Sequence, residues 1–251
     1  MSEQKNLVFD LGMHNGDDTA YYLARGFDVV ALEANPNLCT EGLKRFAANE
    51  KQLTILNKAF ADASVEEIAF YISHTNLEWS STEEWRVLAS SDDATKVIVP
   101  GTDLQTMYDE FGVPHYIKCD LEGADEEFCK QLIFVEEKPA FVSVEAVSGH
   151  WLALIRAAGY DYFQLVNQAK VRRFDQNVEL DSRYGKMTHS FGGHSSGAFG
   201  YDLPTSKWMS FDEAFDIWNQ FTKLRIKDPD ITLDSWFDVH ATTKDVLNTP
   251  A

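Results

Sequence analysis

The chain has 251 residues, 44% hydrophobic and 25% charged, a composition typical of one globular domain with an ordinary apolar core. Its 40 acidic and 22 basic side chains give a formal net charge of −18. This charge repels phosphate backbones and anionic lipids, so nucleic acid is excluded as an expected partner. The opening residues, MSEQKNLVFDLG, resemble neither a signal peptide nor a membrane span, so we expect a cytoplasmic protein with no membrane partner.

Short apolar runs alternate with helical patterns from the start of the chain, which indicates βαβ units and an α/β fold. Strands are predicted at Leu7–Leu11, Val29–Leu32, Thr54–Phe60, Tyr116–Leu121, Ala140–Val144 and Tyr162–Val166, with a less regular strand at Ile68–Ile72. Helices are predicted at Thr19–Arg25, at Leu38–Ala48, from an N-cap at Thr102 to Gly112, at His150–Ala158 and at Asp212–Lys223.

The βα rhythm ends after Val166. A loop rich in glycine and serine, HSFGGHSSGAFG, is followed by the amphipathic helix and then by an apolar run at Trp236–Ala241, which we predict to be a seventh strand. The sequence shows no tight turn between the sixth strand and this last one. We therefore expect residues 169–232 to form an insertion over the carboxyl edge of the sheet, within a single domain spanning 1–251 because no linker is evident.

A glycine turn follows the first predicted strand. Asp10, Gly12 and Gly16 form D-x-G-x-x-x-G before a helix, and glycine there lets a ligand approach the backbone. Glu33 ends the second strand, where a carboxylate can accept hydrogen bonds from both hydroxyls of a ribose. Together these features predict an adenosyl ligand.

Dinucleotide oxidoreductases use a similar turn, with the sequence G-x-G-x-x-G and a helix N-terminus that holds pyrophosphate. Here His14 and Asp17 replace the second and third glycines. Asp17 and Asp18 place two carboxylates in the first helical turn, where they repel a phosphate but not a cationic sulfonium.

A second acidic pair ends the strand in HYIKCDLEGAD. Asp120 and Glu122 are two residues apart, so in extended chain they project to the same side. Because ligands bind at the carboxyl ends of strands in open α/β sheets, these acids are expected to converge with Asp10 and Glu33 on one cleft. A solvated strand exit is the alternative interpretation.

The segments VFDLGMHNGDD, VVALEANPNL, YIKCDLEGAD and FVSVEAV together resemble the FkbM-type methyltransferases, in the same order along the chain. The resemblance implies a Rossmann-like class I methyltransferase fold with a seven-stranded, mostly parallel sheet, whose last antiparallel strand lies between the fifth and sixth. It also implies methyl transfer from S-adenosyl-L-methionine to a hydroxyl of a saccharide or natural-product-like small molecule.

The resemblance also assigns binding residues for the methyl donor. Asp10, Gly12 and Gly16 would hold its methionine part and Glu33 its ribose, with Asn35 in the neighbouring loop, Asp62 near the adenine and Asp120 at the same edge. His14 departs from the family pattern, in which small residues are more usual at this place.

Methyl transfer needs near-attack geometry more than a protein nucleophile, although a free alcohol benefits from a general base. The candidates are Asp120, Glu122, His150, His189 and His194, and the last two bracket a loop that is either a lid over the acceptor or a surface loop. A metal site made from Asp120, Glu122 and a histidine is a further alternative, although no ligand spacing supports it. An NAD(P)-dependent oxidoreductase and a non-catalytic Rossmann-like interaction module are the alternative functions.

Cys39, Cys119 and Cys129 have no metal-site spacing and are expected to be reduced, buried or half-buried thiols. The sequence does not predict the oligomeric state.

Overall fold

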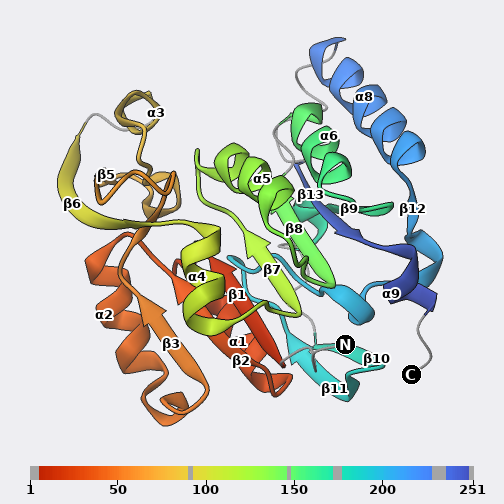
Figure 1. The fold of residues 1–251 in the computed structure, drawn as a ribbon, viewed down its shortest axis with the longest axis horizontal. Helices are drawn as coiled ribbons and strands as arrows, with labels where there is room; N and C mark the ends of the chain where they lie inside the picture. The colour runs from red at the N-terminus through yellow and green to blue at the C-terminus, as the bar shows by residue number, and fades with distance from the viewer. Residues whose placement is uncertain (1–5, 90–92, 146–147, 172–176, 228–235, 249–251) are drawn as a thin grey trace. The chain divides into compact units, whose positions relative to one another are not determined.

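The computed structural model describes residues 6–89, 93–145, 148–171, 177–227 and 236–248. The chain divides into two compact units, Met1–Pro139 and Ala140–Ala251 (Figure 1), which are described in turn. The single-domain organisation stays a prediction. No helix in the described ranges is both long and apolar enough to cross a membrane.

The first unit contains a parallel sheet in the strand order β7-β1-β2-β3. Its strands are β1 (Leu7–Leu11), β2 (Asp28–Leu32), β3 (Leu53–Leu56) and β7 (Tyr116–Cys119). The accompanying helices are α1 (Asp17–Ala24), α2 (Pro36–Arg45), α4 (Leu104–Phe111) and α5 (Asp125–Phe134). This strand–helix alternation is the Rossmann-like α/β fold expected from the sequence, and it brings the carboxyl ends of β1, β2 and β7 to one edge.

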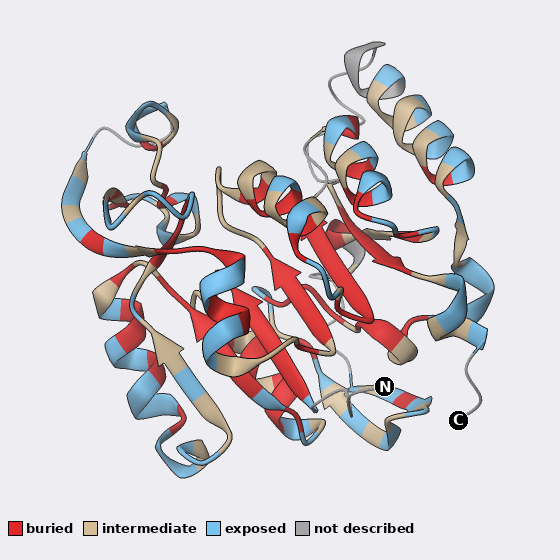
Figure 2. Ribbon diagram, viewed as in Figure 1, coloured by how far each residue is buried: buried red, intermediate tan, exposed pale blue. Residues whose placement is uncertain are grey.

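Helices cover both faces of this sheet. Tyr116 pairs in register with Val8, and its ring lies 5.7 Å from that of Tyr22 on α1. Phe9 points to the opposite face, where its ring lies 6.2 Å from that of Tyr108 on α4. Strands covered on both sides are apolar along most of their length, and β1, β2 and β7 accordingly form the buried centre of the unit (Figure 2).

An excursion between β3 and α4 forms a small additional sheet in the order β4-β6-β5. The strands of this sheet are β4 (Ala59–Phe60), β5 (Glu67–Ser73) and β6 (Ala94–Thr102), and the helix α3 (Glu84–Leu88) lies between β5 and β6 in the chain. The single strand predicted at Thr54–Phe60 is therefore wrong, because the chain leaves the main sheet at Asn57. The Asn57 amide donates hydrogen bonds of 3.0 Å to the carbonyls of both Glu33 and Ala34.

The predicted N-cap at Thr102 is displaced by one residue. Thr102 ends β6, and Asp103 caps α4 by accepting a 3.0 Å hydrogen bond from the Thr106 amide. A carboxylate at the N-cap also interacts favourably with the helix dipole, which explains the choice between the two neighbours. The three cysteines are free and buried, as expected.

The second unit contains strands in the order β12-β9-β13-β8. These are β8 (Phe141–Glu145), β9 (Tyr162–Asn167), β12 (Met209–Ser210) and β13 (Phe237–Thr242), with a separate hairpin of β10 (Asn177–Ser182) and β11 (Gly185–Ser190). The helices are α6 (Gly149–Ala157), α7 (Gln168–Val171), α8 (Phe211–Lys227) and α9 (Lys244–Asn248).

The seventh-strand prediction is confirmed. β13 lies between β8 and β9 and runs antiparallel to both, one residue later in the chain than the predicted bounds. The expectation that no tight turn precedes it is wrong, because β10 and β11 are joined through Arg183 and Tyr184 with Gly185 at φ +92°. The predicted insertion includes this hairpin and all of α8, and its end at residue 232 lies outside the described residues.

Candidate functional site

Gly12 forms the turn that leads out of β1. Its φ of +88° is in the left-handed region, and the amides of Gly12 and Met13 both donate to the Leu32 carbonyl at 3.0 Å. A Cβ at this position would lie 1.8 Å from the carbonyl oxygen of Asp120. The space on the Cβ side of this glycine is therefore filled by the β7 exit, so only glycine fits at this turn. The approach of a ligand to the Gly12 backbone stays a prediction.

The start of α1 is held by contacts from the preceding turn and from Arg45 on α2. Gly16 is the N-cap at φ +83°, and a Cβ there would lie 2.6 Å from the Phe46 ring. The Asn15 side chain accepts a 2.9 Å hydrogen bond from the Asp17 amide, while Arg45 contacts the Asn15 carbonyl at 2.7 Å and the Asp17 carboxylate at 2.8 Å. These contacts and the acidic first turn make the helix end a poor site for pyrophosphate.

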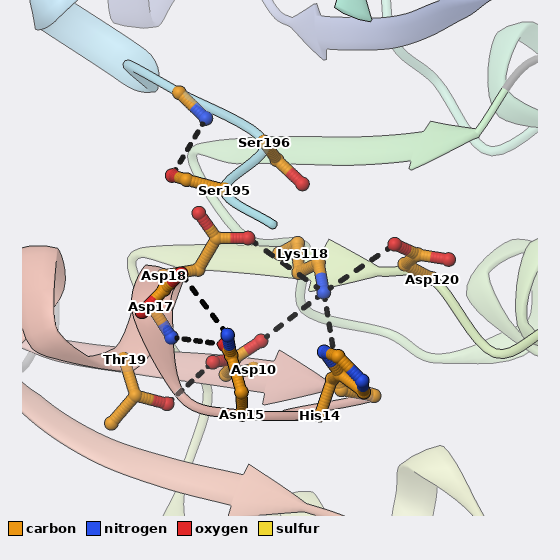
Figure 3. Close-up of polar contacts among 12 residues, drawn as sticks. Asp10, His14, Asn15, Asp17, Asp18, Thr19, Lys118, Asp120, Ser195 and Ser196 are labelled. Carbon is orange, nitrogen blue, oxygen red and sulfur yellow. Dashed lines mark hydrogen bonds and ion pairs between the residues drawn. The ribbon is translucent and has the colours of Figure 1, made fainter. Parts of the chain in front are cut away.

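Lys118 lies among three carboxylates (Figure 3). Its Nζ donates a 2.9 Å hydrogen bond to the Gly12 carbonyl and lies 3.6 Å from Asp10, 3.8 Å from Asp18 and 3.7 Å from Asp120. The Lys118 side chain is only 6% exposed. Three acids facing one ammonium leave this cluster with a net negative charge when all are ionised.

Asp10 is the most deeply buried member of the cluster. One of its oxygens accepts a hydrogen bond from the Thr19 hydroxyl at 2.5 Å, and the other, Oδ1, accepts none from the residues that the structure describes. Burial raises the pKa of Asp10 to about 6, opposed by Lys118 and reinforced by repulsion from Asp18. The site thus holds an acid that titrates close to neutral pH.

Glu33 lies where β2 ends, with 7% of its surface exposed. Its two carboxylate oxygens accept hydrogen bonds from the His14 amide at 2.8 Å and the Asn35 amide at 2.7 Å. Burial raises the pKa of Glu33 to about 7, although these two backbone hydrogen bonds oppose the shift. Each oxygen keeps a second lone pair, so the carboxylate can still accept from two hydroxyls of a ribose.

These residues fit a cationic adenosyl cofactor. The negative cluster around Lys118, the buried Oδ1 of Asp10 and the open lone pairs of Glu33 all lie at the carboxyl edge of β1, β2 and β7. A sulfonium and a ribose suit these groups, whereas the two negative charges of a pyrophosphate do not.

Asn35 and Asp62 have structural contacts of their own. The Asn35 side chain caps α2 by accepting from the Asn37 amide at 3.0 Å. Asp62 is exposed and accepts from the Ser64 amide at 2.9 Å and the Ser64 hydroxyl at 2.6 Å. Their predicted roles beside the donor stay predictions.

The β7 exit differs from its predicted form. The strand ends at Cys119, and Glu122 has a φ of +49°, so the extended geometry expected for Asp120 and Glu122 is wrong. Glu122 instead accepts a 3.0 Å hydrogen bond from Arg86 on α3, and its carbonyl accepts one from the Ser81 hydroxyl. A non-glycine residue in this conformation is strained and is held by such contacts.

Glu122 nevertheless lies close enough to Asp120 for the two carboxylates to repel each other. Burial and, to a lesser extent, repulsion from Asp120 raise the pKa of Glu122 to about 7, although Arg86 opposes this shift. Buried Asp125 holds the loop below by accepting from the amides of Leu121 at 2.9 Å and Gly123 at 3.1 Å. The loop therefore presents two half-buried carboxyls, of which Asp120 is the more exposed.

Lys118 and Arg86 were both missed by sequence reasoning. The signal for Lys118 was available, because a lysine stands in an otherwise apolar buried strand and is the register partner of Asp10. Arg86 had no such signal, because it is brought to Glu122 by the excursion 59–102, far away in sequence.

The predicted histidines lie in the second unit. His189 is on β11 with its ring 4.8 Å from that of Phe191, and His194 is exposed in the loop that follows. Ser195 and Ser196 in this loop are buried, and the Ser196 carbonyl accepts a 3.1 Å hydrogen bond from Gln168. This part of the segment is packed rather than loosely exposed. The approach of either histidine to Asp120 and Glu122 stays a prediction.

Comparison with known proteins identifies a family. The family model of the methyltransferase FkbM domain matches residues 10–162, more than half of the 251 residues. No curated protein matches the chain significantly.

Solved structures similar to the chain include a precorrin-6y C5,15-methyltransferase from Geobacter metallireducens GS-15, with 13% identity, 97% of this chain and 82% of that chain covered, and a TM-score of 0.43. Another is a precorrin 8w decarboxylase from Methanobacterium thermoautotrophicum, which is 12% identical to this chain. The match covers 74% of this chain and 77% of that chain, with a TM-score of 0.37.

Proposed function

We propose that this chain, which belongs to the methyltransferase FkbM domain family, transfers a methyl group from S-adenosyl-L-methionine to a hydroxyl oxygen of a saccharide or natural-product-like small molecule. The observation that carries the choice of donor is the acidic cluster around Lys118, at the edge of the sheet where ligands of α/β proteins bind. A site of net negative charge favours a sulfonium and disfavours a dinucleotide.

S-adenosyl-L-methionine supplies an electrophilic methyl group when bound. The chain's residues would hold the donor and orient the acceptor, which is the principal source of rate in an in-line displacement. Glu33 is placed to accept hydrogen bonds from the ribose hydroxyls, and Asp10 and Asp120 add negative charge beside the donor.

Glu122 is the general base that the geometry supports best. A carboxyl whose pKa is about 7 takes a proton from an alcohol more effectively than an ordinary glutamate at neutral pH. Arg86 fixes its orientation at 3.0 Å, so the free oxygen has a defined direction. In this proposal the acceptor proton would move to the Glu122 carboxylate as the new oxygen–carbon bond forms and the methyl–sulfur bond of the donor breaks, with S-adenosylhomocysteine as the leaving group. Asp120, His150, His189 and His194 remain the alternative bases.

Calorimetric titration with S-adenosylhomocysteine and with NAD⁺ tests the donor assignment. We expect S-adenosylhomocysteine to bind and NAD⁺ not to bind. Glu33→Gln should weaken S-adenosylhomocysteine binding by about 1.5 to 3 kcal/mol, the scale of hydrogen bonds to a charged group. Glu41→Gln, an exposed acid on α2, is the matched control and should leave the affinity unchanged. Binding of NAD⁺ instead would favour an oxidoreductase, and binding of neither ligand a non-catalytic module.

The acceptor group is tested separately by the chemistry of the product. Methyl transfer to a hydroxyl gives an ether, which survives mild alkali, whereas transfer to a carboxylate gives an ester that alkali cleaves. A ¹³C-labelled methyl donor incubated with panels of saccharides and small alcohols, followed by alkali treatment and NMR, distinguishes the two. An alkali-labile label would contradict methylation of a hydroxyl.

A further inference from the structure

Lys118 is a buried cation in the middle of a hydrophobic sheet. It lies on β7 next to β1, with its side chain on the face that α1 covers, and 6% of that side chain is exposed. Burying an ammonium is costly unless carboxylates and hydrogen-bond acceptors surround it. A lysine retained at this place therefore has to be stabilised by the groups around it.

Those groups come from three separate elements. Asp10 belongs to β1, Asp18 to α1 and Asp120 to the segment after β7, and each places a carboxylate oxygen 3.6 to 3.8 Å from Nζ. The fourth contact, the 2.9 Å hydrogen bond to the Gly12 carbonyl, fixes the glycine turn to β7. One side chain thus connects the elements that make the donor edge.

We propose that Lys118 is a positioning residue that sets the net charge of the donor site and thereby its preference for the sulfonium of S-adenosylmethionine over the neutral thioether of S-adenosylhomocysteine. The inference rests on the donor assignment proposed above. Methyl transfer removes one positive charge from the bound cofactor. A more negative site binds cationic S-adenosylmethionine more strongly relative to neutral S-adenosylhomocysteine. Because Lys118 adds a positive charge to the site, it reduces this difference in affinity.

The pKa of Asp10 responds to the charge of the donor site because the Asp10 carboxylate lies 3.6 Å from the Lys118 ammonium. The charged and titratable groups that face the pair are Asp18 and Tyr22 from α1, His14 from the glycine turn, Glu33 after β2 and Asp120 after β7. Lys118 holds down the pKa values of Asp10 and Glu33, which burial raises to about 6 and about 7. Loss of the ammonium raises both, so the site then binds a proton in place of the lysine charge.

The test measures the dissociation constants of S-adenosylmethionine and S-adenosylhomocysteine from about pH 5 to about pH 9. In the wild type the ratio of the two constants should change with a midpoint between about 6 and about 7. Lys118→Met should raise this midpoint by about one unit or more. Above the midpoint the preference for S-adenosylmethionine should increase on the order of tenfold, the effect of one charge across roughly 10 Å at an effective dielectric constant near 20.

Two further variants distinguish charge from packing. Lys118→Arg keeps the charge and should keep the wild-type midpoint. Asp18→Asn removes a negative charge on the opposite side of Nζ, so it should lower both the midpoint and the preference for S-adenosylmethionine. A merely structural lysine would instead weaken both ligands equally and leave the midpoint in place.

The outcomes separate this inference from the donor assignment. If the wild type binds both cofactors and Lys118→Met changes neither the midpoint nor the ratio, the inference is overturned and the donor assignment stands. If Lys118→Met fails to fold, an unchanged midpoint and ratio in Asp18→Asn overturns it instead. If the wild type binds neither cofactor, both proposals fail.

Discussion

Replacement of Gly12 by alanine tests how the donor edge is built. Two costs arise at once, because the φ of +88° is unfavourable for any residue with a Cβ and because that Cβ would lie 1.8 Å from the Asp120 carbonyl. The first cost is about 1 to 2 kcal/mol. The second requires movement of backbone rather than of a flexible side chain, and overpacking of this kind adds about 1 to 3 kcal/mol. Gly12→Ala should therefore lower the free energy of unfolding by about 2 to 5 kcal/mol.

The chain supplies matched controls for the two costs. Gly26 has nearly the same φ, +83°, but a Cβ there meets nothing within 4 Å, so Gly26→Ala measures the conformational cost alone. Gly16 also has φ +83°, and its Cβ would meet the Phe46 ring at 2.6 Å, which can rotate or shift. Urea denaturation should consequently show the smallest loss of stability for Gly26→Ala, a larger loss for Gly16→Ala and the largest for Gly12→Ala. Equal losses for Gly12→Ala and Gly26→Ala would refute the close approach of the β1 and β7 exits.

The remaining predictions concern ionisable groups. The pKa of Glu33 is raised from 4.5 to about 7, so between these pH values the folded state retains a proton that the unfolded state releases. The free energy of unfolding should therefore fall by about 3 kcal/mol as pH rises through this range. Urea denaturation at several pH values should show that Glu33→Gln lacks this pH-dependent loss of stability. Glu122→Gln should lower kcat by about 10² to 10³ while S-adenosylhomocysteine affinity stays within about twofold, with exposed Glu84→Gln as the control; equal kcat in both variants would exclude Glu122 as the base. The double variant His189→Ala, His194→Ala should lose turnover if the insertion closes over the acceptor, and full turnover on the true acceptor would refute a lid.

Much of the fold could be predicted because local patterns determine it. The positions of β1, β2, β7, β8 and β9 follow from apolar runs between helical segments, and β13 from the run at Trp236–Ala241. Errors occurred where one side chain decided the outcome, as at Asn57, whose amide binds the carbonyls after β2 and turns the chain out of the main sheet. The β10–β11 hairpin was missed because Arg183 and Tyr184 are not typical residues of a two-residue turn.

The candidate site was predictable in its acids and less so in its geometry. Asp10 lies near the carboxyl end of β1, and Glu33 and Asp120 directly follow the neighbouring strands β2 and β7, as their positions in the sequence indicated. The left-handed Glu122 could not be inferred, because its conformation depends on contacts from Arg86 and Ser81 in the excursion. Spacing in sequence predicts which strand carries a residue, but not how a loop turns after the strand ends.

Lys118 and Asp10 could have been found together by comparing the two strands. Each is the second-last residue of a short buried strand, and parallel neighbours in register place such residues side by side on the same face. Two opposite charges at matching depth in an otherwise apolar sheet indicate a buried ion pair. The excess of acid arises only when α1 adds Asp18 and the β7 exit adds Asp120, which requires the three-dimensional fold. A charged pair within a buried sheet therefore indicates from sequence where a site lies. The sign of the site's net charge depends instead on the loops and helices that surround the pair.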